Sequence, residues 1–355
     1  MGDTFDLVTN FLHHYLPLNT IFCIRAIFGH FFNFSCNKLY LTIQTIYCSV
    51  LSFVIPLLLY YFGKLNNTVQ IIPVSEYFIG IWVTLVVEND CYKKFESAIQ
   101  HTDQCLGLYR LNLESFRLYA VFFSMVIFRT CITLVILQVY SDNSLSILVF
   151  HFMYISLDLG HLIRISVFDV LYERILQLRK YFERVFNGPP GDYTNMPSDL
   201  KTGLLAYKQL LDSVELLDNL QSTYLVFLVL SFFNCVCRFT KNTIDVFRPN
   251  LDWLSWISFL LDAIYAVVLI FTPPVFVELI HKEVDRISWI LTVQYSTCND
   301  INVRAAISKG ITYLKLRPFE FRIWHTIPVD SSLPLSFMGL AFTYILLMLH
   351  VNKIL

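Results

Sequence analysis

The sequence predicts an all-α protein, a seven-transmembrane helix bundle with its N-terminus inside the cell, its C-terminus outside, and helical extensions that form a cytoplasmic anchor. Three observations carry this prediction. Hydrophobic residues make up 56% of the 355 residues and charged residues 15%, where about 25% charged residues is usual in soluble domains. Seven stretches stay apolar over the roughly 20 residues that a helix needs to cross a bilayer. The polar segments between them alternate in length, so all the long segments lie on one side of the membrane.

The seven stretches share a high apolar content and end where glycine or polar residues begin. In chain order they are residues 39–62, 69–88, 117–139, 145–166, 219–237, 255–279 and 332–351. Gly63 and Lys64 close the first stretch, and Arg238 closes the fifth. Trp253 and Trp256 open the sixth, as expected for aromatic residues at a membrane interface.

The long polar segments contain most of the positive charge. They hold 18 of the 26 lysines and arginines, and cytoplasmic loops carry an excess of these residues. We therefore expect the N-terminus inside, and the chain divides into six parts. They are a cytoplasmic N-terminal segment (1–38), transmembrane helices 1–4 (39–166), a cytoplasmic helical hairpin (167–222), transmembrane helices 5–6 (219–279), a cytoplasmic anchor (280–331), and the last helix with a short external tail (332–355).

The long segments after the fourth and sixth spans have the periodicity of amphipathic helices. In residues 171–186 and again after the break at 187–198, apolar side chains recur at spacings of three and four. The apolar positions are Ile175, Leu178, Phe182 and Val185 in the first helix, and Leu204, Tyr207, Leu211, Val214 and Leu217 in the second. Residues 280–318 repeat the pattern. Such faces need a partner, so we expect them to hold the subunits of an oligomer together; solvated connectors are the alternative interpretation.

The composition excludes several classes of protein. A formal net charge of −1 offers no excess of positive charge to a nucleic acid. The nine cysteines lie mostly within or beside apolar stretches, which favours lipid-facing or packed thiols over a disulfide framework or a zinc site. The sequence has no H-E-x-x-H motif, no G-x-S-x-G motif and no phosphate-binding loop. We therefore expect a protein that is not an enzyme and that needs no cofactor or metal.

The last apolar stretch carries a recognisable motif. Residues 327–351 read IPVDSSLPLSFMGLAFTYILLMLHV, and this sequence resembles the last helix of insect gustatory receptors, members of the insect chemosensory receptor superfamily. The signature of that helix is Thr-Tyr, five hydrophobic residues, then Gln-Phe. Thr343 and Tyr344 match it, as does the apolar run that follows, whereas His350 replaces the Gln and Val351 replaces the Phe.

The resemblance implies a homotetrameric ligand-gated cation channel that acts as a taste receptor. The last helix of each subunit would line a central pore, at Thr343, Tyr344, Leu347, His350 and Val351. The ligand pocket would lie in the outer half of helices 2–6, and the cytoplasmic helices would join the subunits. The implied partners are a small-molecule tastant, permeant cations, membrane lipid and further copies of this chain or related receptors. The implied location is the plasma membrane of chemosensory neurons, in dendrite, axon and cell body.

Two other functions remain open. Because the Gln-Phe ending is missing, the chain could be a divergent gustatory-receptor-like membrane protein without channel activity. A G-protein-coupled receptor also has seven spans, but it would place Asp/Glu-Arg-Tyr at the end of span three and Asn-Pro-x-x-Tyr in span seven. The third span here ends in Leu137-Gln138-Val139-Tyr140, and the seventh has no Asn-Pro. The G-protein-coupled receptor is therefore the weaker alternative.

Ionisable side chains within the spans are candidates for a ligand site, because charges inside a bilayer are costly and are usually functional. Tyrosines and a tryptophan lie at similar depths, and aromatic walls with a few polar groups suit sugars or small amphiphiles. The candidate ligand-binding residues are Glu76, Tyr77, Arg129, His151, Tyr154, Trp256, Asp262 and Tyr265. The alternative is internal pairing that locks the helices together. In either case Arg129 needs an acidic partner, for which Asp262 and Glu76 rank before Asp158.

Overall fold

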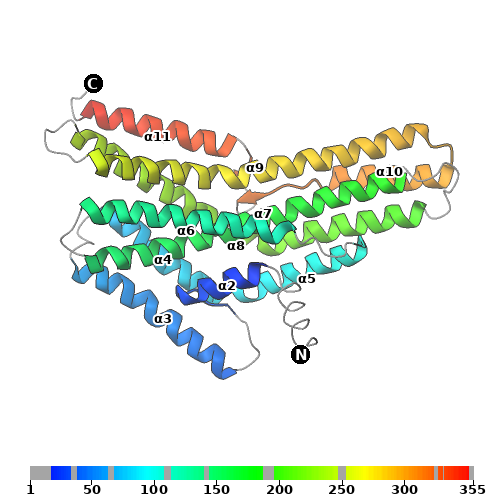
Figure 1. The fold of residues 1–355 in the computed structure, drawn as a ribbon. Helices are drawn as coiled ribbons and strands as arrows, with labels where there is room; N and C mark the ends of the chain where they lie inside the picture. The colour runs from blue at the N-terminus through cyan, green and yellow to red at the C-terminus, as the bar shows by residue number, and fades with distance from the viewer. Residues whose placement is uncertain are drawn as a thin grey trace.

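The computed structural model describes residues 17–32, 38–62, 68–107, 113–139, 144–186, 196–246, 253–323, 327–330 and 332–351. Almost all of this part of the chain is helical, and the helices run roughly side by side as one elongated bundle (Figure 1). The tail at 352–355 and most of the break at 187–198 lie outside the described residues, as does the side chain of Trp256, although its backbone belongs to a helix.

Each predicted span coincides with a helix. The helices are α3 (Lys38–Tyr61), α4 (Thr68–Val83), α6 (Leu113–Val139), α7 (Ser144–Phe186), α8 (Met196–Val246), α9 (Trp253–Thr297) and α11 (Ser332–Val351). This confirms the all-α bundle. By length and composition, three described helices can cross a membrane, and the bent pair α4–α5 would be a fourth. Residues 120–135 of α6 and 332–348 of α11 are shorter apolar helices.

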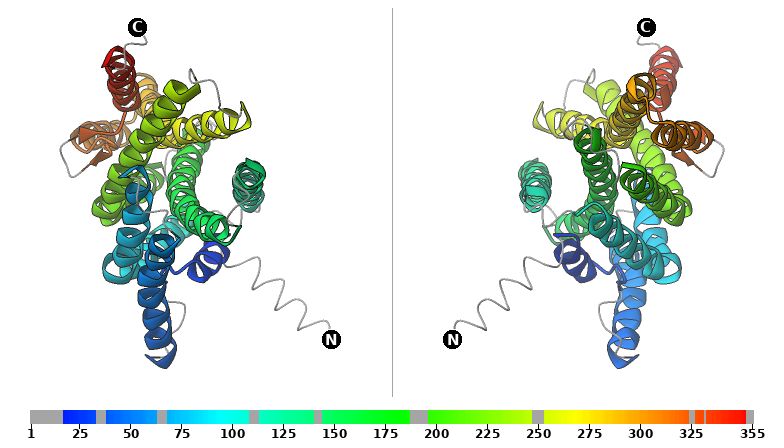
Figure 2. Two further views of the ribbon diagram at one scale, coloured as in Figure 1. Left: turned by 90° about the vertical axis from the view of Figure 1, so that its left-hand side faces the viewer. Right: turned by 90° about the vertical axis from the view of Figure 1, so that its right-hand side faces the viewer.

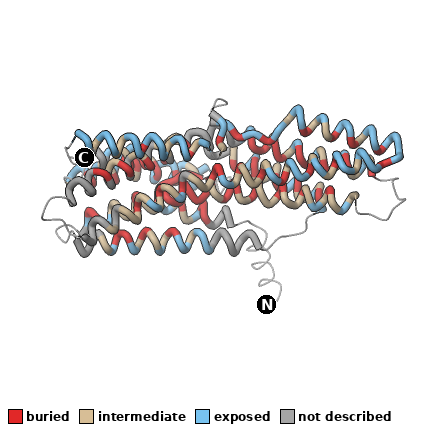
Figure 3. Tube along the Cα trace, turned by 90° about the horizontal axis from the view of Figure 1, so that it is seen from above, coloured by how far each residue is buried: buried red, intermediate tan, exposed pale blue. Residues whose placement is uncertain are grey.

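Three helices continue far beyond their apolar parts, as the periodicity predicted. α7 has 43 residues, α8 has 51 and α9 has 45. Their extensions form the right-hand end of the bundle in Figure 1, together with α10 (Ile301–Leu316) and α5 (Asn89–Cys105). Seen from above, buried residues follow the inner faces of these helices and exposed residues the outer faces (Figure 3).

The apolar faces of the extensions are buried inside the single chain. Leu178, Phe182 and Tyr207 are fully buried, and Leu211 and Val214 are nearly so. These residues therefore find their partner within the chain, because α5, α9 and α10 pack against α8 and cover them. A role of this region in joining subunits stays a prediction. The burial also rules out a solvated connector at these positions.

Two helices were not expected from the sequence. α5 continues α4 through a π-helical segment, Thr84–Glu88, at a bend of 64°. Its residues Tyr92, Phe95 and Ile99 are buried at the spacing of an amphipathic helix, and the helix packs against α8. α2 (Pro17–Ile27) has only 11 residues, too few to span a bilayer, yet it packs against α7.

A short hairpin connects α10 to α11. Strand β1 (Arg322–Ile323) pairs antiparallel with β2 (Ile327–Pro328). The hairpin and its flanks are fastened to the long helices: the backbone oxygen of Arg317 accepts a hydrogen bond of 3.0 Å from the Tyr207 hydroxyl, and the ring of Phe321 packs edge-on against Phe168 at 5.0 Å. Strands of two residues have no detectable sequence pattern, which is why they were not predicted.

Within the bundle, α3 diverges from the other helices. In Figure 2 it reaches away from the rest of the molecule, with α2 and α4 at its inner side. Many of its large apolar side chains are exposed, among them Leu39, Leu57 and Tyr61. Exposure of such residues along a whole helix is expected where lipid is the solvent.

Candidate ligand site and pore helix

Arg129 on α6 is the centre of the buried polar network. Its Nε and Nη2 donate to the two carboxylate oxygens of Asp158 on α7, at 2.7 and 3.0 Å. Its Nη1 donates to Oδ1 of Asp262 on α9, at 2.9 Å. All three residues are at most 9% exposed. A bidentate guanidinium–carboxylate pair with a second acid joins three helices by charge-assisted hydrogen bonds.

Two tyrosines flank the guanidinium. The Cζ atom of Arg129 lies 4.9 Å from the ring centre of Tyr154 and 5.0 Å from that of Tyr265. Both distances are within cation–π range. Phe128 extends the aromatic wall, with its ring 5.4 Å from that of Tyr265.

His151 is held at the edge of this network through Thr133. The Thr133 hydroxyl donates to the backbone oxygen of Arg129 at 2.9 Å, and the Thr133 hydroxyl oxygen lies 2.7 Å from Nδ1 of His151. Because the hydroxyl has one hydrogen, this geometry assigns the ring proton to Nδ1, which donates to Thr133. In a neutral ring, Nε2 is then an acceptor at a half-buried position.

The described residues beside the network line one small cavity. A cavity of about 10 Å³ adjoins Asp158, which is at the lower limit for one water molecule. Its other walls are apolar side chains of α6 and α7: Phe122, Met125, Val126, Ile155, Leu159 and Leu162. A ligand of tastant size does not fit this cavity unless side chains move.

Glu76 and Tyr77 belong to a second place in the bundle. Oε1 of Glu76 lies 3.8 Å from Nε2 of His161, and the Tyr77 hydroxyl donates to the backbone oxygen of Phe28 at 3.3 Å. The pairing of Glu76 with Arg129 was wrong, because Glu76 lies beside His161 of α7 and Arg129 binds Asp158 and Asp262. Of the acids considered, Asp262 and Asp158 supply the pairing, and Asp158 makes the closer contact.

The second place is a polar cluster that sequence reasoning largely missed. It surrounds a cavity of about 20 Å³ lined by Arg25, His30, Glu76, Gly80, Ser156, Leu157, Gly160, His161 and Arg164. A signal was available for α7, since Asp158, His161 and Arg164 recur every three residues and share one helix face. Arg25 and His30 gave no signal, because they come from a segment that was taken to be cytoplasmic.

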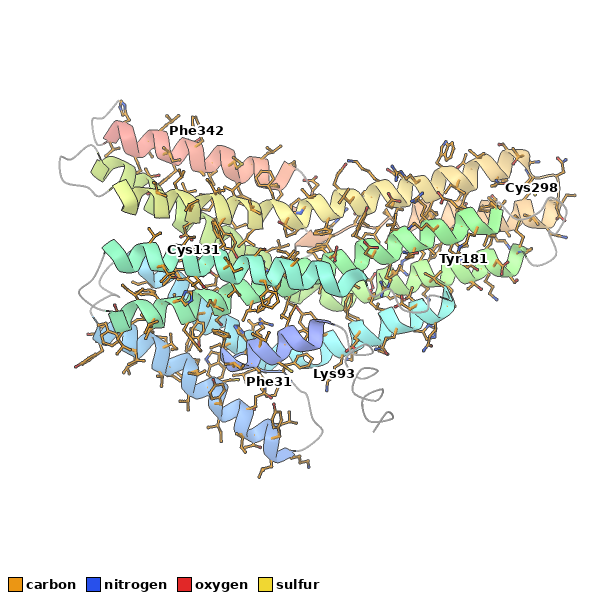
Figure 4. The ribbon with its side chains drawn as sticks, viewed as in Figure 1. Phe31, Lys93, Cys131, Tyr181, Cys298 and Phe342 are labelled. Atoms are coloured by element: carbon orange, nitrogen blue, oxygen red, sulfur yellow. The ribbon has the colours of Figure 1, made fainter. Side chains whose placement is uncertain are left out.

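α11 presents most of the predicted pore residues at its surface. Thr343, Leu347, His350 and Val351 are exposed in the single chain, as is Phe342, which Figure 4 marks on α11. Tyr344 differs from them: its half-buried side chain packs against the hydrophobic core. The structure therefore brings four of these five residues to the surface and turns Tyr344 inward. Among the described residues, no three His, Cys, Asp or Glu side chains are placed to hold a metal ion.

Comparison with known proteins gives a structural match along nearly the whole chain. The insect olfactory receptor OR5 from Machilis hrabei aligns with a TM-score of 0.64 and 15% sequence identity, covering 94% of this chain and 98% of that chain. The same receptor in complex with eugenol aligns with a TM-score of 0.63 and 14% identity, covering 94% and 97%. The chain shares the fold of this receptor. No protein-family model and no curated protein matches the sequence.

The shared fold is the kind of fold that the resemblance of the last helix implied. The gustatory assignment itself rests on residues 327–351.

Proposed function

We propose that this chain is a chemosensory receptor, a taste receptor by the resemblance of its last helix, that acts as a homotetrameric ligand-gated cation channel in the plasma membrane. The observation that carries the proposal is the fold shared with an insect olfactory receptor over 94% of the chain. One of those structures contains a small molecule, eugenol. A receptor of this kind responds when a ligand binds one of its conformations better than the other.

The network around Arg129 is the proposed ligand site. It connects α6, α7 and α9 by hydrogen bonds of 2.7 to 3.0 Å. A ligand that competes for one of these hydrogen bonds would therefore change how the three helices pack against one another. Aromatic walls from Tyr154 and Tyr265 suit a small molecule that combines a ring or chain with polar groups. Glu76 and Tyr77 lie outside this site and are not proposed to contact the ligand.

α11 is the proposed pore helix. Its apolar residues Leu347 and Val351 and its polar residues Thr343 and His350 are exposed in the single chain. Four copies of α11 around an axis would cover them. The proposed topology places the N-terminus inside the cell and the C-terminus outside. Thr343, Leu347 and His350 recur at spacings of four and three, so one face of α11 would line the pore.

Expression of the full chain in cells that lack related receptors tests the proposal. Membrane current is recorded during application of a tastant panel, with and without block of G-protein signalling. A ligand-evoked current that survives the block supports the channel. Current that the block abolishes favours a G-protein-coupled receptor, and ligand binding without current favours a relative without channel activity.

A variant with a matched control tests the site. Asp262→Asn keeps the shape of the side chain and the Asp158 pair but weakens the bond to Arg129, so we expect the ligand concentration for half-maximal current to shift about tenfold, or about 1.4 kcal/mol. Asp285→Asn removes an exposed charge from the same helix and should leave that concentration unchanged. Equal responses of the two variants would place the ligand elsewhere.

A further inference from the structure

The chain turns inside the bundle after α2. Residues 28–32, the N-terminal turn, are half-buried at the first position and buried at the other four. Irregular backbone that is shielded from water needs partners for its polar groups. Two helices supply them at one atom: the backbone oxygen of Phe28 accepts hydrogen bonds from the hydroxyls of Tyr77 on α4, at 3.3 Å, and Ser156 on α7, at 3.4 Å. The N-terminal turn is therefore bound to both helices.

The same turn contacts the bend between α4 and α5. The backbone N–H of Phe31, a residue marked in Figure 4, donates to Oγ1 of Thr84 at 3.0 Å. The Thr84 hydroxyl donates in turn to the backbone oxygen of Ile81 at 2.7 Å. Thr84 is fully buried and is the first residue of the π-helical segment Thr84–Glu88. The N-terminal turn therefore binds the bend at the residue where the α-helical hydrogen-bond pattern changes.

The bend has a local cause. A threonine hydroxyl that bonds to a carbonyl oxygen of the preceding turn can bend a helix, and π-helical segments are rare and often lie at functional sites. α4 and α5 meet here at 64°, and α5 then packs against α8. A straighter α4–α5 helix would need a change of backbone hydrogen bonding in only the five residues of the π-helical segment.

The N-terminal turn fits its place closely. Gly29 has a φ of +91°, a conformation that favours glycine. A Cβ at this position would lie 3.1 Å from Cδ1 of Leu51 on α3 and 3.3 Å from the Tyr77 hydroxyl. A larger residue at Gly29 would therefore displace the turn without any change to Thr84.

We propose that the N-terminal turn is a latch on a hinge at Thr84–Glu88. The hydrogen bond from Phe31 to Thr84 holds α4 and α5 in the bent state, and its release lets α5 swing toward the axis of α4. Because the latch also accepts a hydrogen bond from Ser156, a movement of α7 reaches the hinge through the N-terminal turn. This device is separate from the network around Arg129 and does not depend on the proposed function.

Distance measurements by double electron–electron resonance on the purified full chain test the latch. Spin labels are introduced as non-canonical residues at Ser75 on α4 and Gln100 on α5, which are both exposed. With a helical rise of about 1.5 Å per residue, straightening the 64° bend lengthens the distance between the two positions by about 5 Å. Thr84→Val keeps the shape of the side chain but offers no acceptor to Phe31. Because an unsatisfied buried N–H is costly, the share of the longer distance should rise about tenfold or more in this variant.

Three further variants separate the latch from packing. Thr84→Ser keeps the hydroxyl and should keep the distance of the unmodified chain. Thr130→Val is the matched control, because it removes a hydroxyl that bonds to the backbone oxygen of Val126 within its own helix; it should also keep that distance. Gly29→Ala displaces the turn from its other side and should produce the longer distance although Thr84 is intact.

Two outcomes would overturn the proposal. If Thr84→Val and Gly29→Ala, or whichever of them folds, keep the distance of the unmodified chain, the packing of α5 on α8 fixes the bend and the turn is not a latch. If Thr84→Val lengthens the distance and Gly29→Ala leaves it unchanged, Thr84 acts within α4 and not through the turn.

Discussion

Removal of the Arg129 guanidinium is the sharpest perturbation of this bundle. In Arg129→Met the apolar stem remains, but the carboxylates of Asp158 and Asp262, with side chains 8% and 12% exposed, lose their shared counter-charge. Leaving buried charge uncompensated costs about 3–5 kcal/mol. With an unfolding entropy of about 2.1 cal/mol/K per residue, this corresponds to a fall in Tm of about 5 °C.

The assay is thermal unfolding of the purified chain in detergent, with two comparison variants. Arg322→Met removes an arginine whose side chain is 50% exposed and paired with Glu320, and such surface pairs contribute about 0–1 kcal/mol, so its Tm should change by about 1 °C or less. The triple variant Arg129→Met, Asp158→Asn, Asp262→Asn removes the uncompensated charge and should recover part of the loss. The reasoning is refuted if Arg129→Met is as stable as Arg322→Met, or if the triple variant is no more stable than Arg129→Met alone.

Two further predictions concern single positions. Hydrogen bonds from Ser332 lower the pKa of Asp330, so its contribution is present at neutral pH and is lost as pH falls through the lowered pKa. Asp330→Ala should therefore lower the stability by about 1 kcal/mol at pH 7 and by less in acid, measured as Tm against pH. Gly203→Ala would place its Cβ 2.7 Å from the buried Phe182 ring and should lower Tm, because overpacking costs about 1–3 kcal/mol.

The helix bundle could be predicted from local sequence because the patterns that define it are local. A run of about 20 apolar residues is long enough to span a bilayer, and spacings of three and four place side chains on one helix face. These rules located every long helix, including the extensions of α7 and α9. The motif of α11 pointed to a superfamily whose fold the structure shares, but its match was confined to about 25 residues.

The buried network of Arg129 shows where such rules stop. The sequence indicated that an intramembrane arginine needs an acid, since the cost of an isolated charge does not depend on the fold. Which acid it contacts depends on how α6, α7 and α9 pack, and Asp262 is 133 residues away in the chain. The predicted depth in the membrane ranked Glu76 too high as a partner of Arg129, because depth does not specify which helices face each other.

The sequence by itself determined that this is a helical membrane bundle, where its spans lie, and that its interior holds charges in need of partners. Only the tertiary structure decided that α8 is covered within one chain, that α2 inserts Arg25 beside α7, and that two polar clusters exist in place of one. The physical reason is that apolar length and helical period are properties of consecutive residues. Pairing between side chains far apart in the chain is fixed by packing, which leaves no periodic pattern in the sequence.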